Sequence, residues 1–305
     1  MRRRLKIVLP AVVSMLLVAS SAFAFGDFGD WGDAEDIETH GAGADDDLNT
    51  RATEGCPFIS PDGKMLFFAS NRGGLSGLDI WVTTRRSEND PWGEPVKLGA
   101  PINSPADDFC PTISRDGKTF FFVSTRDGHC GSTLNADIYT ARFDSRLEVD
   151  SVTHLGCEVN SPWDEHSPFP ATLPGEGPVL FYSSARPANG NDAPGDHDIY
   201  VSPMRGGTYR AGHALSGVNT TDNEGQPNVR RDGRELFFWS DREEGADIYS
   251  AARLSVTGEW GSPENLGPKV NSDDSETRPS LSWDGTTLYF GSTRSGQSDI
   301  YVTTR

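Results

Sequence analysis

Residues 271–305 read NSDDSETRPSLSWDGTTLYFGSTRSGQSDIYVTTR, and this stretch holds one copy of the pattern that decides the fold. It contains the pair Asp284-Gly285, followed by an apolar run at 288–290 and, after Arg294, by Asp299-Ile300-Tyr301, which begins another strand. An Asp-Gly pair next to apolar runs predicts a β-hairpin, because glycine supplies the positive φ that such a turn demands. The stretch therefore predicts short β-strands joined by tight turns.

Five copies of this pattern follow one another along the chain, at intervals of 52 to 59 residues. Each copy carries a carboxylate five positions after its first Asn and a proline eight positions after it. Trp-Gly pairs at 92–93 and 260–261 mark a fourth strand. Four-stranded units repeated around a ring are the blades of a β-propeller. The sequence therefore predicts an all-β fold, a single five-bladed β-propeller over residues 49–305. Its units start near Asn49, Asn103, Asn160, Asn219 and Asn271.

The N-terminal region offers the strand that the fifth unit needs. Residues 31–37 begin with Trp-Gly and end six positions later in Ile37, which matches the spacing of 92–98 and 260–266. We predict that residues 31–37 complete the last blade and close the ring, which removes the exposed edge of an open ring. This strand lies in an acidic N-terminal segment over residues 25–48. The alternative is that the segment is a disordered leader, because residues 38–47 are rich in Gly and Asp.

The first 24 residues have the features of an export signal. Basic residues at 2–4 precede an apolar stretch at 7–19, and Ala22-Phe23-Ala24 is a small-x-small cleavage site. These features predict a Sec-type signal peptide cut after Ala24, and hence a periplasmic or secreted protein. A membrane anchor is the alternative, although the apolar stretch is short for the roughly 20 residues of a spanning helix.

The chain is acidic, with 45 Asp and Glu against 27 Lys and Arg and a formal net charge of −18. Such a charge repels phosphate backbones and anionic lipids, so we expect no nucleic-acid partner. Divalent cations or basic protein surfaces remain possible partners, and the charge also has a simpler role in solubility. We expect a monomer.

The four cysteines predict two disulfides, because an even count in an exported chain usually means a disulfide framework. Cys130 lies in a long loop of the second unit and Cys157 in the segment that enters the third, on the same face. Cys56 and Cys110 occupy equivalent positions in neighbouring units. We predict the pairs Cys130–Cys157 and Cys56–Cys110, the second if the two Cα atoms come within about 7 Å.

The residues that recur in every unit predict structural roles first. An Arg and an Asp flank one loop of each unit, as Arg72 and Asp79 do, and we expect them to pair. The repeated carboxylates should ring one mouth of the channel, where Ca²⁺ is a possible ligand, although no cofactor is otherwise expected. The alternative is that each bonds to its own inter-blade loop. The five are Glu54, Asp108, Glu165, Glu224 and Glu276.

Departures from the repeat predict where function is added, because the scaffold does not require them. The loops after the second strand are long in the second and third units, at 127–136 and 187–197. We predict a binding face there, with ordinary variable surface loops as the alternative. Its candidate residues are Asp127, His129, Trp163, Asp164, His166, Asn189, Asp192 and His197.

The complete motif is carboxylate-x-x-Pro, Ser-x-Asp-Gly, an apolar run, Ser-x-Arg and Asp-Ile-Tyr. It resembles the WD40-like repeat of TolB-type β-propellers over residues 49–305. The resemblance implies the propeller fold. It implies no single function, since such repeats occur in periplasmic translocation proteins, in peptidase propeller domains and in other exported proteins.

The sequence leads us to expect a non-catalytic module that binds a protein or glycan in the bacterial envelope. The alternative is a five-bladed glycoside hydrolase or polysaccharide lyase. Glycosidases need two carboxylates in different environments, and the repeated carboxylates all obey the repeat. Asp164 and Glu165 beside His166 are the best candidates for a break in that symmetry. We assign no catalytic residue, because the sequence contains no nucleophile elbow, zinc-protease motif or phosphate-binding glycine loop.

Overall fold

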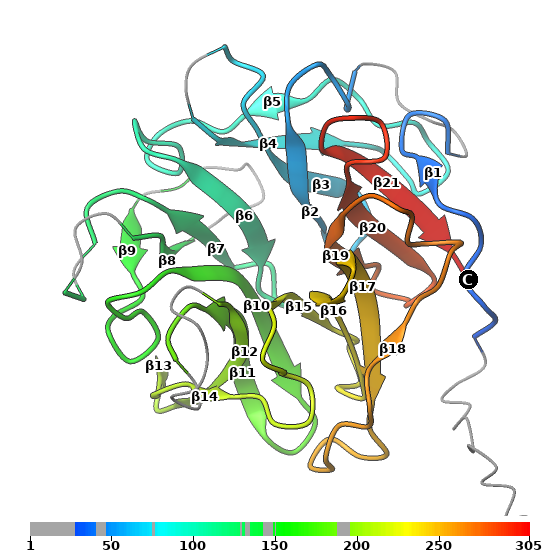
Figure 1. Ribbon diagram of the computed structural model, residues 1–305. Coiled ribbons are helices and arrows are strands. Elements are labelled where there is room, and N and C mark those ends of the chain that lie inside the picture. The colour runs from blue at the N-terminus through cyan, green and yellow to red at the C-terminus, as the bar shows by residue number, and fades with distance from the viewer. Residues whose placement is uncertain are drawn as a thin grey trace, which may run out of the picture.

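The structure is a computed structural model, which describes residues 28–40, 47–74, 77–128, 130–131, 135–142, 149, 151–187 and 196–305. Every regular element in these residues is a β-strand, and the strands form five antiparallel sheets around a common centre (Figure 1). The predicted five-bladed β-propeller is confirmed. The predicted signal peptide and the candidate residues His129, Asn189 and Asp192 lie outside the described residues. Within the described part, no helix is long and apolar enough to cross a membrane.

Each blade runs from an inner strand at the channel to an outer strand at the rim. Blade one contains β2 (Glu54–Ile59), β3 (Met65–Ser70), β4 (Asp79–Thr84) and β5 (Val96–Lys97). Blade two contains β6 (Asp108–Ile113), β7 (Thr119–Ser124), β8 (Asp137–Arg142) and β9 (Val152–His154). Blade three contains β10 (Glu165–Leu173), β11 (Gly177–Ser184) and β12 (Asp198–Arg205), with β13 (Thr208–Tyr209) and β14 (His213–Ala214) sharing its outer position.

The remaining two blades complete the ring. Blade four contains β15 (Glu224–Val229), β16 (Glu235–Glu243), β17 (Gly245–Ala252) and β18 (Glu264–Asn265). Blade five contains β19 (Glu276–Leu281), β20 (Thr287–Ser292) and β21 (Asp299–Thr304), and its outer strand is β1 (Glu35–Asp36).

The N-terminal segment closes the ring through β1. Glu35 pairs with Val302 and Asp36 with Tyr301, and the Gly32 N–H donates to the Thr304 carbonyl oxygen at 2.7 Å. The Trp31 side chain is only 8% exposed, and its ring meets Phe237 of blade four edge-on, with centroids 5.9 Å apart. The N-terminal segment thus joins the two ends of the described propeller and covers the edge of β21.

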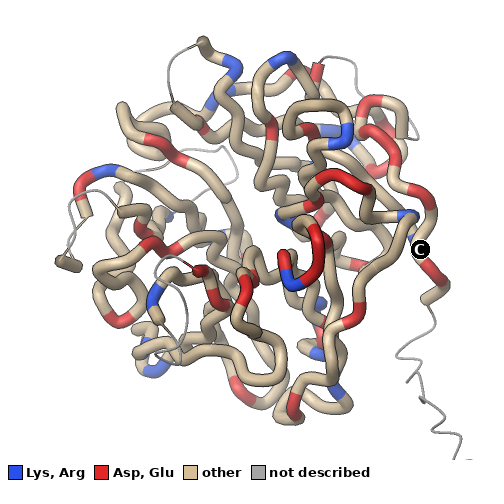
Figure 2. The backbone as a smooth tube through the Cα atoms, viewed as in Figure 1, with Lys and Arg blue, Asp and Glu red and all other residues tan. Residues whose placement is uncertain are grey.

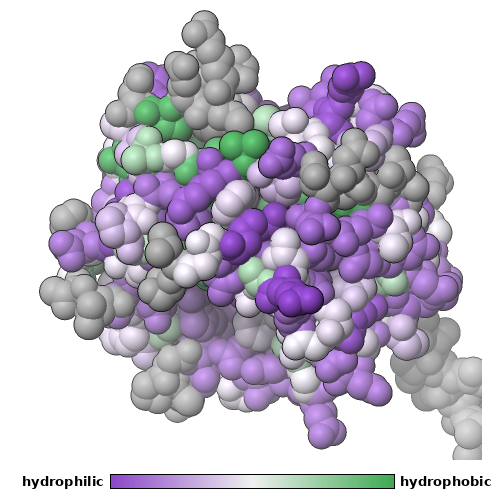
Figure 3. All heavy atoms as spheres, turned by 90° about the horizontal axis from the view of Figure 1, so that it is seen from above, coloured by the Kyte–Doolittle hydropathy of each residue, from purple (hydrophilic) through white to green (hydrophobic). Residues whose placement is uncertain are grey.

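The core lies between neighbouring sheets. The apolar runs of the second strands are fully buried, and Phe67 of β3 packs against Phe120 of β7 with ring centroids 5.6 Å apart. These runs are buried on both faces, which explains why they show no polar alternation. The edge of the disc seen in Figure 3 is mainly hydrophilic, with small separate hydrophobic areas. Acidic residues are spread over all five blades (Figure 2).

Candidate functional site

A buried carboxylate fastens each inner strand to the rest of its blade. In blade one, Glu54 is ion-paired with Arg72 at 3.1 Å, and the Ser70 hydroxyl donates to the same carboxylate at 2.7 Å. The Thr50 N–H of the inter-blade loop donates to its other oxygen at 3.1 Å. We call this arrangement the carboxylate lock. The other four ion pairs measure 2.6–3.1 Å and are Arg126–Asp108, Arg186–Glu165, Arg242–Glu224 and Arg294–Glu276.

The locks bear on two expectations, the pairing of Arg72 with Asp79 and a calcium site at the repeated carboxylates. The pairing of Arg72 with Asp79 is wrong, because Arg72 bonds to Glu54 while Asp79 is paired with Lys97 at 2.6 Å. All five lock carboxylates are fully buried, so each needs a countercharge that stays in place. Serine, arginine and backbone partners occupy their oxygens, which favours a structural role over a calcium site. The described residues hold no group of three or more His, Cys, Asp or Glu that could bind a metal ion.

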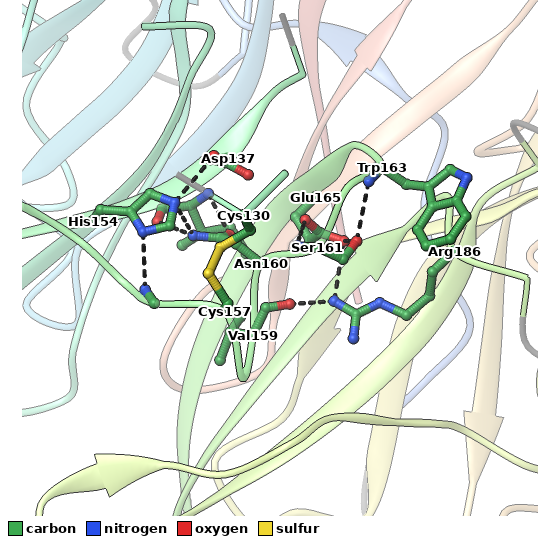
Figure 4. Close-up of a disulfide and its surroundings, with 12 residues drawn as sticks. Cys130, Asp137, His154, Cys157, Val159, Asn160, Ser161, Trp163, Glu165 and Arg186 are labelled. Atoms are coloured by element: carbon green, nitrogen blue, oxygen red, sulfur yellow. Dashed lines mark hydrogen bonds and ion pairs between the residues drawn. A yellow bond between two sulfur atoms is a disulfide. The ribbon is translucent and has the colours of Figure 1, made fainter. Parts of the chain in front are cut away.

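Both predicted disulfides are present in the structure. Cys56 and Cys110 join the inner strands of blades one and two, with Cα atoms 4.7 Å apart. Cys130 and Cys157 join the loop of blade two to the segment that enters blade three, with Cα atoms 5.4 Å apart. Figure 4 shows this second disulfide between the His154–Asp137 pair and the lock of blade three.

One position in each inner strand directs a residue to the central channel. It lies at a β-bulge, seven residues after the first Asn of the unit, and its φ is 46° to 63° although none of the five residues is glycine. Such angles are uncommon outside glycine, and bulges re-aim side chains. The five residues line a central cavity of about 40 Å³. They are Cys56, Cys110, Ser167, Gln226 and Arg278.

These five bulge residues divide the channel into two chemically different halves. Blades one and two contribute a disulfide, whereas blades three, four and five contribute a hydroxyl, an amide and a guanidinium. The fivefold symmetry of the repeat is therefore lost in the central channel, where blades three to five contribute polar side chains.

Further polar side chains lie close to the cavity without lining it: His166 precedes Ser167 in β10, and the charge of Arg278 acts on it. The rings of His166 and His197 stack with centroids 4.9 Å apart, and Phe109 meets His166 edge-on at 5.4 Å. We call His166, His197, Gln226, Trp239 and Arg278 the channel cluster.

Two glycines make room for the largest members of the channel cluster. A Cβ added at Gly225 would lie 2.5 Å from the Trp239 Nε1 atom, so the indole N–H covers this residue of the neighbouring strand. A Cβ added at Gly55 would lie 2.9 Å from the Arg278 Nη1 atom, which places the guanidinium of blade five against blade one. The absence of side chains at both glycines leaves the space that these two groups occupy.

Four atoms of the channel cluster are buried without a hydrogen-bond partner among the described residues: His197 Nε2, Gln226 Oε1, Trp239 Nε1 and Arg278 Nε. A buried polar group that lacks a partner costs about 1–3 kcal/mol. Native proteins contain few such groups, and each requires an explanation. Gln226 and Arg278 also line the central cavity, so a ligand that enters it can supply their missing partners.

The two histidines of the cluster are held neutral. Burial, reinforced by His197 and Arg278, lowers the pKa of His166 to about 4, although Asp164 opposes the shift. Burial also lowers the pKa of His197, against the opposing charges of Asp164 and Asp196. A neutral imidazole keeps a lone pair on one ring nitrogen and accepts a proton there. At neutral pH the cluster therefore combines two proton acceptors with one guanidinium cation.

The structure brings together part of the predicted binding face. Asp164 influences the pKa of both His166 and His197, and its Oδ1 accepts the Ala136 N–H at 2.8 Å. Trp163 lies on the adjoining loop with 42% of its surface exposed (Figure 4). The carbonyl of Asp127 accepts the Tyr139 hydroxyl at 3.1 Å, which ties that residue to the loop of blade two.

Three members of the channel cluster were not predicted as site residues: Gln226, Trp239 and Arg278. The repeat contained the signal for two of them. Gln226 and Arg278 stand where blades one and two have cysteines, so the position seven residues after each Asn differs in chemistry from unit to unit. Trp239 directly follows the apolar run of the fourth unit and gave no such signal.

No protein-family model matches the sequence, and no curated protein resembles it in sequence. Solved structures do resemble it in fold. The endo-arabinase from Bacteroides thetaiotaomicron VPI-5482 is 15% identical with a TM-score of 0.58, over 83% of this chain and 94% of that one. The GH62 α-L-arabinofuranosidase catalytic domain of Coprinopsis cinerea is 10% identical with a TM-score of 0.56, over 91% and 97%. A putative TolB from Agrobacterium tumefaciens is 17% identical with a TM-score of 0.50, over 88% and 79%.

These comparisons contradict the expectation of a non-catalytic binding module. Structures described as an endo-arabinase, a family-43 glycoside hydrolase, GH62 hydrolases and an α-L-arabinofuranosidase share the fold of this chain. The expectation rested on the symmetry of the repeated carboxylates, and that symmetry belongs to the locks alone. The channel, which the repeat does not describe, is asymmetric.

Proposed function

We propose that this chain is an enzyme that cleaves glycosidic bonds in a polysaccharide, as a glycoside hydrolase, and that the channel cluster is its active site. The observation that carries the proposal is the group of partnerless polar atoms on blades three to five, at the point where the ring loses its symmetry. Perturbed titratable groups in a concave site are candidates for catalysis. The glycoside hydrolases among the solved structures with this fold support the same class of reaction.

The cluster supplies acid–base chemistry in an asymmetric form. Hydrolysis of a glycosidic bond needs one group that activates water and a second that protonates the leaving oxygen. His166, kept neutral by burial, is the proton acceptor in this proposal, with His197 stacked on it. Asp164 is the adjoining carboxylate, and its charge stabilises the imidazolium that forms when His166 takes up the proton of water and that returns a proton to the leaving oxygen. Glu165 is excluded from that role because Arg186 and two serine hydroxyls hold it in the lock.

The repeat type and the cellular location remain parts of the proposal. The TolB-type character of the repeat is supported by the motif and by the likeness to the putative TolB. The features of residues 1–24 support export to the periplasm or beyond. A polysaccharide of the envelope or of the surroundings is the substrate such a location offers.

The test is the release of reducing ends from a panel of purified polysaccharides, including arabinan and polymers of hexoses, pentoses and uronic acids. We expect the wild-type protein to cleave at least one member. The variant His166→Ala/His197→Ala should lose that activity, whereas His213→Ala, at an exposed histidine of β14, should keep it. Ultraviolet absorbance of the products separates hydrolysis from elimination, since only elimination leaves an unsaturated sugar. Wild-type protein that cleaves no polymer of the panel would overturn the proposal.

A further inference from the structure

Arg278 is the cation of the central channel, and no carboxylate faces it among the described residues. It forms no ion pair and no hydrogen bond with them, and its Nε atom is fully buried. Burial lowers the pKa of Arg278, and no neighbouring charge opposes the shift. An arginine nevertheless stays protonated in proteins. The channel therefore holds a partly buried positive charge that the described residues leave uncompensated.

The chain has 45 acidic residues against 27 basic ones, so carboxylates are plentiful. Arg230 contacts both Asp232 and Glu235, and Arg305 contacts Glu235 with two nitrogens at 2.7 and 2.9 Å. Carboxylates are thus available to arginines elsewhere in the molecule, but none of the described carboxylates pairs with Arg278. A partly buried charge without a countercharge is only partly solvated, so an anion that enters the channel is attracted to it.

The shape of the channel limits what can reach the guanidinium. Its volume of about 40 Å³ has room for a few water molecules, since one water needs roughly 10–15 Å³ of such space. A carboxylate group fits this space, whereas a whole sugar ring does not. Ser167 and Gln226 line the same cavity and add a hydroxyl and an amide to the guanidinium.

We propose that Arg278 binds the carboxylate of an acidic sugar, so that the polysaccharide cut by this chain contains uronic acid residues. The inference rests on the proposed function, because it names the substrate class of the same site. In this arrangement the sugar ring lies across the channel mouth beside His166 and His197, and only its carboxylate enters the cavity. The planar guanidinium matches a carboxylate with two parallel hydrogen bonds. The Gln226 amide and the Trp239 indole N–H remain available for the other oxygens of the sugar.

The test compares matched ligands that differ only in charge. Oligomers of galacturonic acid, their methyl esters and their carboxyl-reduced forms are titrated into the His166→Ala/His197→Ala protein, so that binding is measured without cleavage. We expect the acidic oligomers to bind about 10- to 100-fold more tightly than the two neutral forms. Arg278→Gln, added to that protein, should abolish the difference, whereas Arg210→Gln, at an exposed arginine, should leave it unchanged.

The outcomes separate the two proposals. Equal affinity for acidic and neutral oligomers, or a preference that survives Arg278→Gln, would overturn the role of Arg278. Cleavage of a neutral polysaccharide that is unaffected by Arg278→Gln would also overturn it, while the proposed function would stand. Charge-dependent binding that requires Arg278, without cleavage of any polymer, would support the uronate site and refute the enzymatic proposal. A third outcome is that inorganic phosphate competes with the oligomers although acidic and neutral oligomers bind equally well. The site would then be one for small free anions, and the uronate proposal would be overturned.

Discussion

The carboxylate locks and the channel cluster both contain partly buried arginines, and the two regions treat that residue in opposite ways. Each lock arginine meets a fully buried carboxylate at 2.6–3.1 Å, and the same arrangement occurs in all five blades. Arg278 occurs in one blade only and has no such partner in the described part of the chain. The lock arginines are therefore satisfied by carboxylates of their own blades, whereas the arginine that breaks the repeat at the channel has no such partner among the described residues.

The largest expected effect comes from breaking a lock and removing the channel arginine in parallel. Arg242→Ala leaves Glu224 buried without its countercharge, which should lower the free energy of unfolding by about 3–5 kcal/mol. Arg278→Met removes a charge that has no partner, so its free energy of unfolding should be unchanged or higher. Denaturant unfolding of both variants beside the wild type measures the contrast. A comparable loss of stability in both would show that Arg278 has a structural partner, and the comparison would fail.

A smaller loss of stability is expected from the disulfide half of the channel. Replacing Cys56 and Cys110 together by Ala should cost about 2–4 kcal/mol, because the bridge closes a loop over a sequence separation of 54 residues. The channel cluster lies on blades three to five, so cleavage and uronate binding at a temperature where the variant is folded should be retained. Loss of both at full folding would mean that blades one and two belong to the active site as well.

The sequence was sufficient for the features that depend on local pattern. The Asp-Gly turns, the apolar runs and the Trp-Gly pairs recur at fixed offsets, so the number of blades, the strands and the closing segment at 31–37 could be predicted. The partner of Arg72 could not be, because Asp79 is closer in the sequence while Glu54 is brought to it by strand pairing. The local pattern shows which residues are repeated, but their partners are decided by the register between strands.

The channel cluster could not be predicted from the sequence, for a related reason. Gln226 and Arg278 reach the channel because a bulge gives them a positive φ, and the sequence marks that bulge only by the proline that follows. Arg278 crosses to Gly55, which lies more than 200 residues earlier in the chain. The site therefore forms only when the ring is complete. His166 and His197 were predicted individually, but their stacking depends on the way β10 and the segment before β12 meet.

The smallest expected effect is a dependence of stability on pH that belongs to His166. The folded protein keeps this imidazole neutral down to a pKa of about 4, whereas the unfolded chain protonates it below about 6.5. Between these values the unfolded state binds more protons, so stability falls as the pH is lowered through this window. The loss assigned to His166 is on the order of 2 kcal/mol at pH 4.5 relative to pH 7. Other groups titrate in the same range, so the measurement is the difference between the wild type and His166→Gln, each unfolded by denaturant at both pH values.

The variant should lose less stability than the wild type on acidification. Equal losses would show that His166 is protonated as readily in the folded protein as in the unfolded chain. In that case it would be charged at mildly acidic pH, and its role as a proton acceptor beside Arg278 would be confined to neutral and alkaline conditions.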